Sequence, residues 1–245
     1  MCKRFTFQIP SALLTQMFGL AEHPTVFPRY NIAATQQVPT IRQDVAGLNQ
    51  FDYMHWGLIP SWTKNRSVGS KMVNARSLTL MDKPAFRQAV QYQRCLVIAS
   101  GYYDWELVGN RMQPMYIHLK GSSLMVFAGL WDSWKSSRGE VVVSCTILTI
   151  NSGQTTRKPR WSLIEPHEHR MPVILHPDEY LGWLDRNATD PASLAHLYRQ
   201  YPADLMEKWP VSPLVNSLKN DSADLIIPFY DFPHHSKEPD EKDQG

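Results

Sequence analysis

Apolar residues recur with a helical spacing in four short stretches of the chain. After Pro10 and Ser11 they stand at positions 12, 13, 14, 17 and 18, which predicts a helix that begins at Ser11. The same kind of pattern predicts helices over residues 83–90, 177–185 and 191–199, each with a proline in its first turn.

Strand patterns are more numerous than helical ones. β-branched and aromatic residues are frequent in residues 38–42, 50–58, 94–98, 115–119, 124–130 and 141–150. The strands do not alternate regularly with helices, which argues against a doubly wound sheet. The pattern predicts an α+β fold with a curved, largely antiparallel β-sheet or barrel core and a few peripheral helices. No repeat or Gly/Ser-rich linker divides the chain, so we expect one domain over residues 1–232 and a disordered, charged tail over 233–245.

Composition narrows the class of protein. The 245 residues are 43% hydrophobic, and no window reaches the roughly 18 apolar residues of a spanning helix. The N-terminus lacks the apolar core of a signal peptide, and three widely spaced cysteines form no disulfide framework. We expect a protein of a reducing compartment that makes no membrane contact: cytoplasmic, and associated with the nucleoid if the source is bacterial.

Positive charge is concentrated in one segment. The formal net charge is only +2, but the last ten residues carry a net −2, so residues 1–235 carry +4. Between positions 64 and 87 there is one acid, Asp82, and there are six cations: Lys64, Arg66, Lys71, Arg76, Lys83 and Arg87. Such a cluster suits a polyanion such as nucleic acid, although a solvated basic face is an equally ordinary explanation.

Cys2 is the first candidate for chemistry. Removal of Met1 would leave it with a free α-amine and a thiol, whose usual pKa values are about 8 and about 8.5, so both nucleophiles are partly available at neutral pH. Such an aminothiol condenses with an aldehyde through its amine and then closes a thiazolidine ring through its thiolate. The alternative is that a cysteine at this position is chance.

Two tryptophans and a basic strand form the second candidate. Trp56 and Trp62 flank a proline turn, and Asn74 and Arg76 follow on extended chain within the basic segment. Aromatic faces and cations together suit the bases and phosphates of a single strand. Tryptophans that flank a turn are also frequent in cores and lids.

Two further segments place titratable groups next to apolar strands. Residues 94–106 run through an apolar strand to Asp104, which stands between aromatic residues. Such a setting can raise the pKa of a carboxyl group toward the range used in acid–base catalysis. The alternative is a half-exposed strand end without a catalytic role. Residues 164–175 pack His167, Glu168 and His169 before an Arg-Met-Pro turn. The spacing of these three does not match the helical zinc motif, so we expect no metal site and no cofactor.

Together these segments resemble one known family, the SOS response associated peptidase (SRAP) domain. The resemblance extends to about Pro228 and rests on ordered motifs: MCKRF, RYNIAATQQVP, WGLIPSW, NARS, KPAFR, RCLVIASGYYDW and RMPVIL. It implies a mixed, largely β domain with a basic cleft for single-stranded DNA. It also implies a sensor of abasic sites, whose open-chain sugar is an aldehyde that the protein traps covalently as a thiazolidine.

The resemblance also implies roles for individual residues. Cys2 corresponds to the nucleophile and Asn74 to a residue that contacts the abasic sugar. Asp104 occupies the position of a family glutamate and is one methylene shorter. The family histidine before the Arg-Met-Pro turn falls on Glu168, so either Glu168 replaces it or a shift of one residue brings His167 into its place.

The resemblance further implies a DNA-binding surface and a partner. Phosphate contacts are expected from Arg4, Lys71 and Arg76, stacking from Pro39, Trp56 and Trp62, and weaker contacts from Arg160 and Trp161. The expected partner is single-stranded DNA that contains abasic sites, bound by a monomer without a metal. Two alternatives stay open: a thiol autopeptidase or hydrolase that uses Cys2, and a DNA-binding relative that forms no covalent link.

Overall fold

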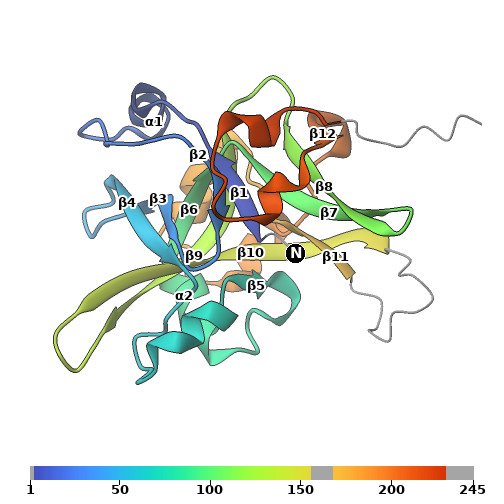
Figure 1. The fold of residues 1–245 in the computed structure, drawn as a ribbon. Coiled ribbons are helices and arrows are strands. Elements are labelled where there is room, and N and C mark those ends of the chain that lie inside the picture. Colours follow the sequence, from blue (N-terminus) through green and yellow to red (C-terminus); the bar gives the residue numbers. More distant parts are fainter. Residues whose placement is uncertain (1–2, 156–167, 230–245) are drawn as a thin grey trace, which may run out of the picture.

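The computed structural model describes residues 3–155 and 168–229 (Figure 1). One layer of the fold is an antiparallel sheet of five strands in the order β12-β8-β7-β1-β2. Its members are β1 (Arg4–Phe7), β2 (Arg29–Ala33), β7 (Gly101–Val108), β8 (Arg111–Leu119) and β12 (Met206–Pro210). The predicted tail, 233–245, lies outside the described residues.

The second layer is a closed barrel, as the sequence predicted. Its strands are β3 (Gln37–Gln43), β4 (Asn49–Trp56), β6 (Arg94–Ala99), β9 (Met125–Lys135) and β10 (Val141–Thr155). Pairing runs β10-β4-β3-β6-β9, and β9 pairs again with β10 and closes the ring. Only the β4–β10 pair in this ring is parallel. Outside it, β5 (Asn74–Arg76) and β11 (Glu168–Pro172) both pair with β10.

Helices are short and peripheral. The α-helices are α1 (Ser11–Phe18), α2 (Pro84–Tyr92) and α3 (Tyr180–Leu184). The 3₁₀ helices are η1 (Arg66–Lys71), η2 (Ser77–Thr79), η3 (Pro177–Glu179), η4 (Pro191–Leu197), η5 (Ala203–Leu205), η6 (Pro213–Asn216) and η7 (Ala223–Ile226). No helix in the described ranges has the length and apolar character needed to span a bilayer.

Two of the helix predictions need correction. In the segment predicted as a helix over 191–199, Pro191–Leu197 form the 3₁₀ helix η4 rather than an α-helix. The segment 177–185 begins as the 3₁₀ turn η3 before α3. In η4 the buried residues Leu194 and Leu197 are three positions apart, which matches the three residues per turn of a 3₁₀ helix. The side chain of Asp190 accepts a hydrogen bond from the Ala192 amide and fixes the first turn.

Four short strands were not predicted. They are β1, β2, β11 and β12. β7 was not expected either, because only the first part of its segment, now β6, was predicted as a strand. β12, for example, reads Met-Glu-Lys-Trp-Pro, and its extended form is set by full pairing with β8. Long-range pairing therefore decides these elements, not local propensity.

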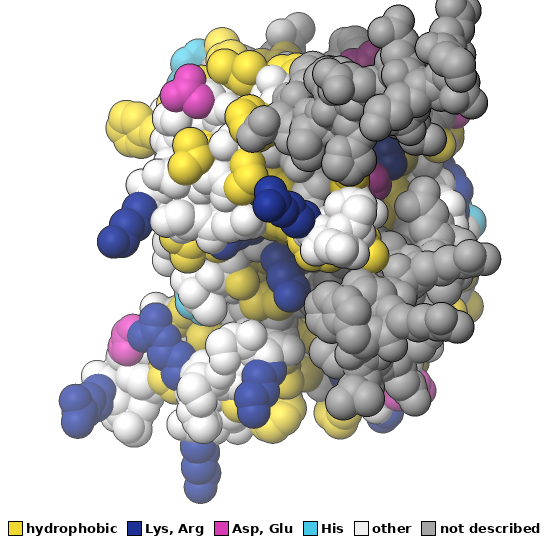
Figure 2. Space-filling view, turned by 45° about the vertical axis from the view of Figure 1, so that its right-hand side comes forward, with side chains coloured by type: hydrophobic (Ala, Val, Ile, Leu, Met, Phe, Trp, Pro, Cys, Tyr) yellow, Lys and Arg dark blue, Asp and Glu magenta, His cyan; other side chains and the backbone are white. Residues whose placement is uncertain are grey.

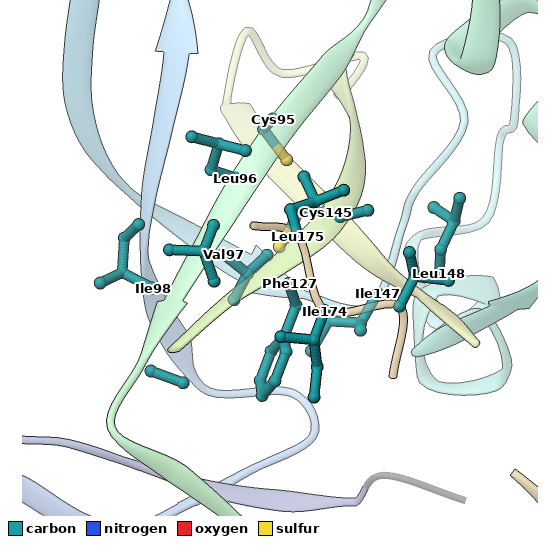
Figure 3. Packing of buried hydrophobic residues seen from close by; sticks show 14 of the residues in the cluster. Cys95, Leu96, Val97, Ile98, Phe127, Cys145, Ile147, Leu148, Ile174 and Leu175 are labelled. Atoms are coloured by element: carbon teal, nitrogen blue, oxygen red, sulfur yellow. The ribbon is translucent and has the colours of Figure 1, made fainter. Parts of the chain in front are cut away.

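The core lies inside the barrel and against the inner face of the sheet. The ring of Phe5 on β1 lies 5.2 Å from that of Trp56 and 5.8 Å from that of Phe127, which joins the sheet to the barrel. Figure 3 shows the sulfur atoms of Cys95 and Cys145 among apolar side chains such as those of Val97 and Leu175. Both cysteines are fully buried and free, so they are core residues, as the sequence indicated.

Candidate active site and nucleic-acid interface

Strand β1 fixes the chain immediately after Cys2. β1 lies between β2 and β7, and Arg4 pairs with Ala33 on one side and Tyr103 on the other. Because β1 and β7 are antiparallel, the residue after Tyr103 lies at the end of β1 that leads to Cys2. That residue is Asp104, whose side chain is half-buried. Cys2 itself lies outside the described residues.

Asn74 is connected to β1 through the core. The indole Nε1 of Trp56 donates a 2.8 Å hydrogen bond to the carbonyl of Val73, the residue before Asn74. Trp56 in turn packs edge-on against Phe5. Asn74 then pairs in parallel with Ile147 of β10 and is half-buried.

Strand β11 reaches the other side of the same part of β10. Thr149 pairs with Arg76 of β5 on one side and with Pro172 of β11 on the other. The β10–β11 ladder runs from Pro172 back to Glu168, with a shift of register between Asn151 and Thr155. The backbone of Glu168 is therefore part of this sheet, whereas His167 lies outside the described residues.

The loop that carries Trp62 is held by hydrogen bonds to the barrel. The Ser61 amide donates to Oδ2 of Asp132 at 2.8 Å, and the Ile59 amide donates to Oγ of Ser144 at 2.8 Å. Trp134 Nε1 donates to the Thr63 carbonyl at 2.7 Å. Trp62 is 65% exposed on this fixed loop, so its ring is available for stacking.

The six cations of residues 64–87 are all exposed. Arg66 forms an ion pair with Glu140 at 2.7 Å, and the Arg87 Nε donates to the Met81 carbonyl. Figure 2 shows many Lys and Arg side chains and few acidic ones over the lower half of one face, where η1, β5 and α2 lie in Figure 1. This surface is therefore electropositive and suits a polyanion.

Two of the predicted stacking residues are not available for contact with DNA. Trp56 is fully buried and Pro39 is buried, so neither presents a ring to a base. Three of the five donors of the Arg4 guanidinium are directed to Asn31 and to two main-chain carbonyls. Arg4 is half-buried, and its phosphate contact stays a prediction. Trp62, Lys71 and Arg76 are exposed, as a contact surface requires. Arg160 and Trp161 fall outside the described residues.

Two residues that hold the Trp62 loop were not predicted from the sequence. Asp132 and Ser144 are buried polar residues on barrel strands that bind the amides of the Trp62 loop. They lie more than 70 positions from the residues they bind, so a local pattern does not reveal them. Across the described residues there is no group of three His, Cys, Asp or Glu side chains that could hold a metal ion.

Burial makes the thiols of the two core cysteines unreactive. Loss of solvation raises the pKa of both the Cys95 and the Cys145 thiol well above the ordinary value. For Cys95 the nearby Cys145 adds to this shift. At neutral pH both are protonated and poor nucleophiles.

Comparisons with known proteins show the family to which the chain belongs. The chain is 38% identical over 92% of its length to the abasic site processing proteins YoqW and YoaM of Bacillus subtilis, and covers 99% and 97% of them. It is 31% identical to the abasic site processing protein HMCES of Gallus gallus, of which it covers 56%. A crystal structure of a Bacteroides thetaiotaomicron protein superimposes with a TM-score of 0.77 at 22% identity over 93% of this chain and 100% of that one. The model of the SOS response associated peptidase (SRAP) family matches residues 1–218, and the chain belongs to that family.

Proposed function

We propose that this protein processes abasic sites in single-stranded DNA by a covalent link through Cys2. Two observations support the proposal: the β1–β7 pairing, which sets Asp104 opposite the residue after Cys2, and the Phe5–Trp56–Val73 contacts, which connect β1 to the residue before Asn74. Relatives that span nearly the same length bear the name of abasic site processing proteins.

The chemistry follows from the two nucleophiles of processed Cys2. Its α-amine adds to the aldehyde carbon of the open-chain sugar, and loss of one water gives an imine. The thiolate then adds to the imine carbon, the nitrogen takes up a proton, and the five-membered thiazolidine closes. Asn74 holds the sugar, Asp104 transfers protons during imine formation, and Glu168 or His167 assists ring opening and reversal.

The exposed cations and Trp62 bind the single-stranded DNA. Lys71 and Arg76 pair with phosphates, and Trp62 stacks on a base. Phosphate contacts and stacking do not read base identity, so binding is independent of sequence and weakens with salt.

The test is an adduct between the pure protein and an abasic single strand that survives denaturation. Wild type is expected to give it and Cys2→Ala to give none. Both Cys2→Ala and Cys2→Ser keep the α-amine and lack the thiol, so the imine of either variant should be trapped only after borohydride reduction. Cys95→Ala, in the core, is the matched control and should crosslink like wild type. An undiminished adduct in Cys2→Ala would exclude this mechanism.

A second candidate is a thiol hydrolase, which the family description as a peptidase favours. Cys2 would then act on a peptide bond of its own or another chain. Loss of Met1 alone, seen by intact-mass measurement, fits both functions. Cleavage of other peptides by the pure protein, without an adduct on abasic DNA, would favour the hydrolase.

A further inference from the structure

Residues 212–221 cross the outer face of the five-stranded sheet, and we call this segment the C-terminal arch. In Figure 1 it is the red chain that passes over β1 and β2. Phe5 points from β1 into the barrel, so Arg4, its neighbour on the strand, points to the opposite face. The arch therefore covers the side of β1 on which Arg4 lies.

Asn31 of β2 is the centre of the contact between sheet and arch. It is 1% exposed, and its Nδ2 group donates to three carbonyls of the arch, those of Val215 at 3.2 Å, Ser217 at 3.0 Å and Asn220 at 2.8 Å. Its Oδ1 atom accepts a 3.0 Å hydrogen bond from Arg4. A buried amide with its hydrogen-bonding groups used in this way specifies one geometry.

Arg4 joins β1 to the same carbonyls. It donates through Nη1 to Val215 and through Nη2 to Asn216 at 2.9 Å. Within the described part of the chain no carboxylate lies at ion-pair distance from it, so its partners there are neutral oxygens. Burial lowers the pKa of Arg4, with an opposing effect of Tyr103, in line with a guanidinium that is partly withdrawn from water.

The far end of the arch is held as well. Asp221 accepts hydrogen bonds from the Asn31 amide at 2.9 Å and from the Tyr30 amide at 2.5 Å, and it forms an ion pair with Arg29. Trp105 of β7 donates to Oδ1 of Asn216 at 2.9 Å. The arch is thus fixed to three adjacent strands of the sheet.

We propose that the C-terminal arch is a positioning element for Cys2 and that Arg4 is the positioning residue that connects the two. Covalent geometry keeps the α-carbons of positions 2 and 4 within about 8 Å, so the placement of Arg4 limits that of Cys2. The rate of the covalent step then depends on the arch, because a displacement of about 1 Å can cost on the order of 100-fold in rate. DNA affinity depends on the arch less than the rate does, because three of the five Arg4 donors are directed to oxygen atoms of the protein. The inference rests on the proposed function.

The experiment separates rate from affinity. The variants are Arg4→Lys, which keeps the charge and cannot bridge the same acceptors, and Asp221→Ala, which releases the far end of the arch. The control is Lys219→Ala, which removes an exposed cation of the arch outside this network. We expect the single-turnover adduct rate at saturating abasic DNA to fall at least about 10-fold in both variants, within the range of misplacement effects. The Kd for intact single-stranded DNA should change less than about twofold, as should both quantities in the control.

Salt dependence gives an independent outcome. If Arg4 contacted a phosphate, Arg4→Met would reduce the slope of log K against log salt by about 0.7, and we expect the slope to be unchanged. A reduced slope, or wild-type adduct rates in variants whose melting curves show a folded protein, would overturn the inference alone. Absence of a Cys2-dependent adduct in wild type would overturn the proposed function and this inference with it.

Discussion

Gly57 and Gly69 lie in direct backbone contact. A β-carbon on Gly57 would lie 2.6 Å from the Gly69 carbonyl oxygen, and one on Gly69 would lie 2.7 Å from the Gly57 carbonyl oxygen. Gly57 also has φ = +143°, a conformation that favours glycine. The Leu58 amide donates to the Met72 carbonyl at 3.1 Å in the same region. The contact joins the start of the Trp62 loop to η1, which carries Arg66 and Lys71.

Gly69→Ala should therefore destabilise the protein and weaken DNA binding together. The new methyl group would overlap the Gly57 carbonyl and lie 2.9 Å from Ile59 Cγ1, so the free energy of unfolding should fall by about 1 to 3 kcal/mol. Urea denaturation measures the first effect and fluorescence anisotropy with labelled DNA the second. Gly182→Ala, on an exposed helical position with open space, should be neutral or stabilising. An equal response of the two variants would contradict this reading.

Asp132→Ala should loosen the loop that carries Trp62. Asp132 is 8% exposed and accepts hydrogen bonds from the Ser61 amide and from Gln93 Nε2. Leaving these donors without an acceptor costs about 1 to 3 kcal/mol, measured by urea denaturation. Asp52→Ala removes a more exposed carboxylate whose ion pair with Arg42 is worth about 0 to 1 kcal/mol. A loss in Asp52→Ala as large as in Asp132→Ala would show that burial is not the cause.

Trp62→Ala should weaken DNA binding without loss of stability, whereas Trp56→Phe should lower the stability of the fold. Trp62 is 65% exposed, so its removal should weaken single-strand binding by about 1 to 3 kcal/mol and leave unfolding unchanged. Trp56→Phe deletes a buried hydrogen-bond donor to Val73 and should lower stability by about 1 to 3 kcal/mol. DNA titration and thermal melting of both variants make the comparison. Unchanged DNA affinity in Trp62→Ala would remove that residue from the proposed interface.

Asp104→Asn should slow adduct formation by at least about 100-fold, the scale of general acid–base catalysis. Asp104→Glu keeps a carboxylate and restores the side-chain length implied by the family resemblance, so its single-turnover rate should equal or exceed that of wild type. Glu168→His, tested beside it, should change the rate of reversal. A wild-type rate in Asp104→Asn would exclude a proton-transfer role.

Thiol labelling should distinguish the cysteines by burial. The raised pKa of Cys95 and Cys145 keeps both protonated at pH 8, so iodoacetamide should label neither in the folded protein. We expect one label on native wild type, none on native Cys2→Ala and three on unfolded wild type by mass spectrometry. Labelling of Cys95 or Cys145 under native conditions would contradict their placement in the core.

Strands with strong β patterns were predictable, and so was the chemistry of one residue. Segments such as 38–42 and 94–98 carry β-branched and apolar residues that favour strands in most contexts, and they became β3 and β6. The aminothiol chemistry of Cys2 depends only on its position after Met1. Charge is equally local, since the basic segment is visible without any contact map.

Tertiary structure decided which of these groups face the solvent and which hold the fold. Trp56 and Trp62 flank the same turn in the sequence, yet the first fills the space between Phe5 and Val73 and the second is exposed. In the sequence Arg4 is a cation close to the nucleophile Cys2. In the structure it donates a hydrogen bond to the carbonyl of Val215, which is 211 positions away. Propensity and charge act over a few residues, so the sequence by itself determined the strands, the basic segment and the nucleophile. The partners of buried polar groups are set by strand pairing across the whole chain, which only the folded structure determines.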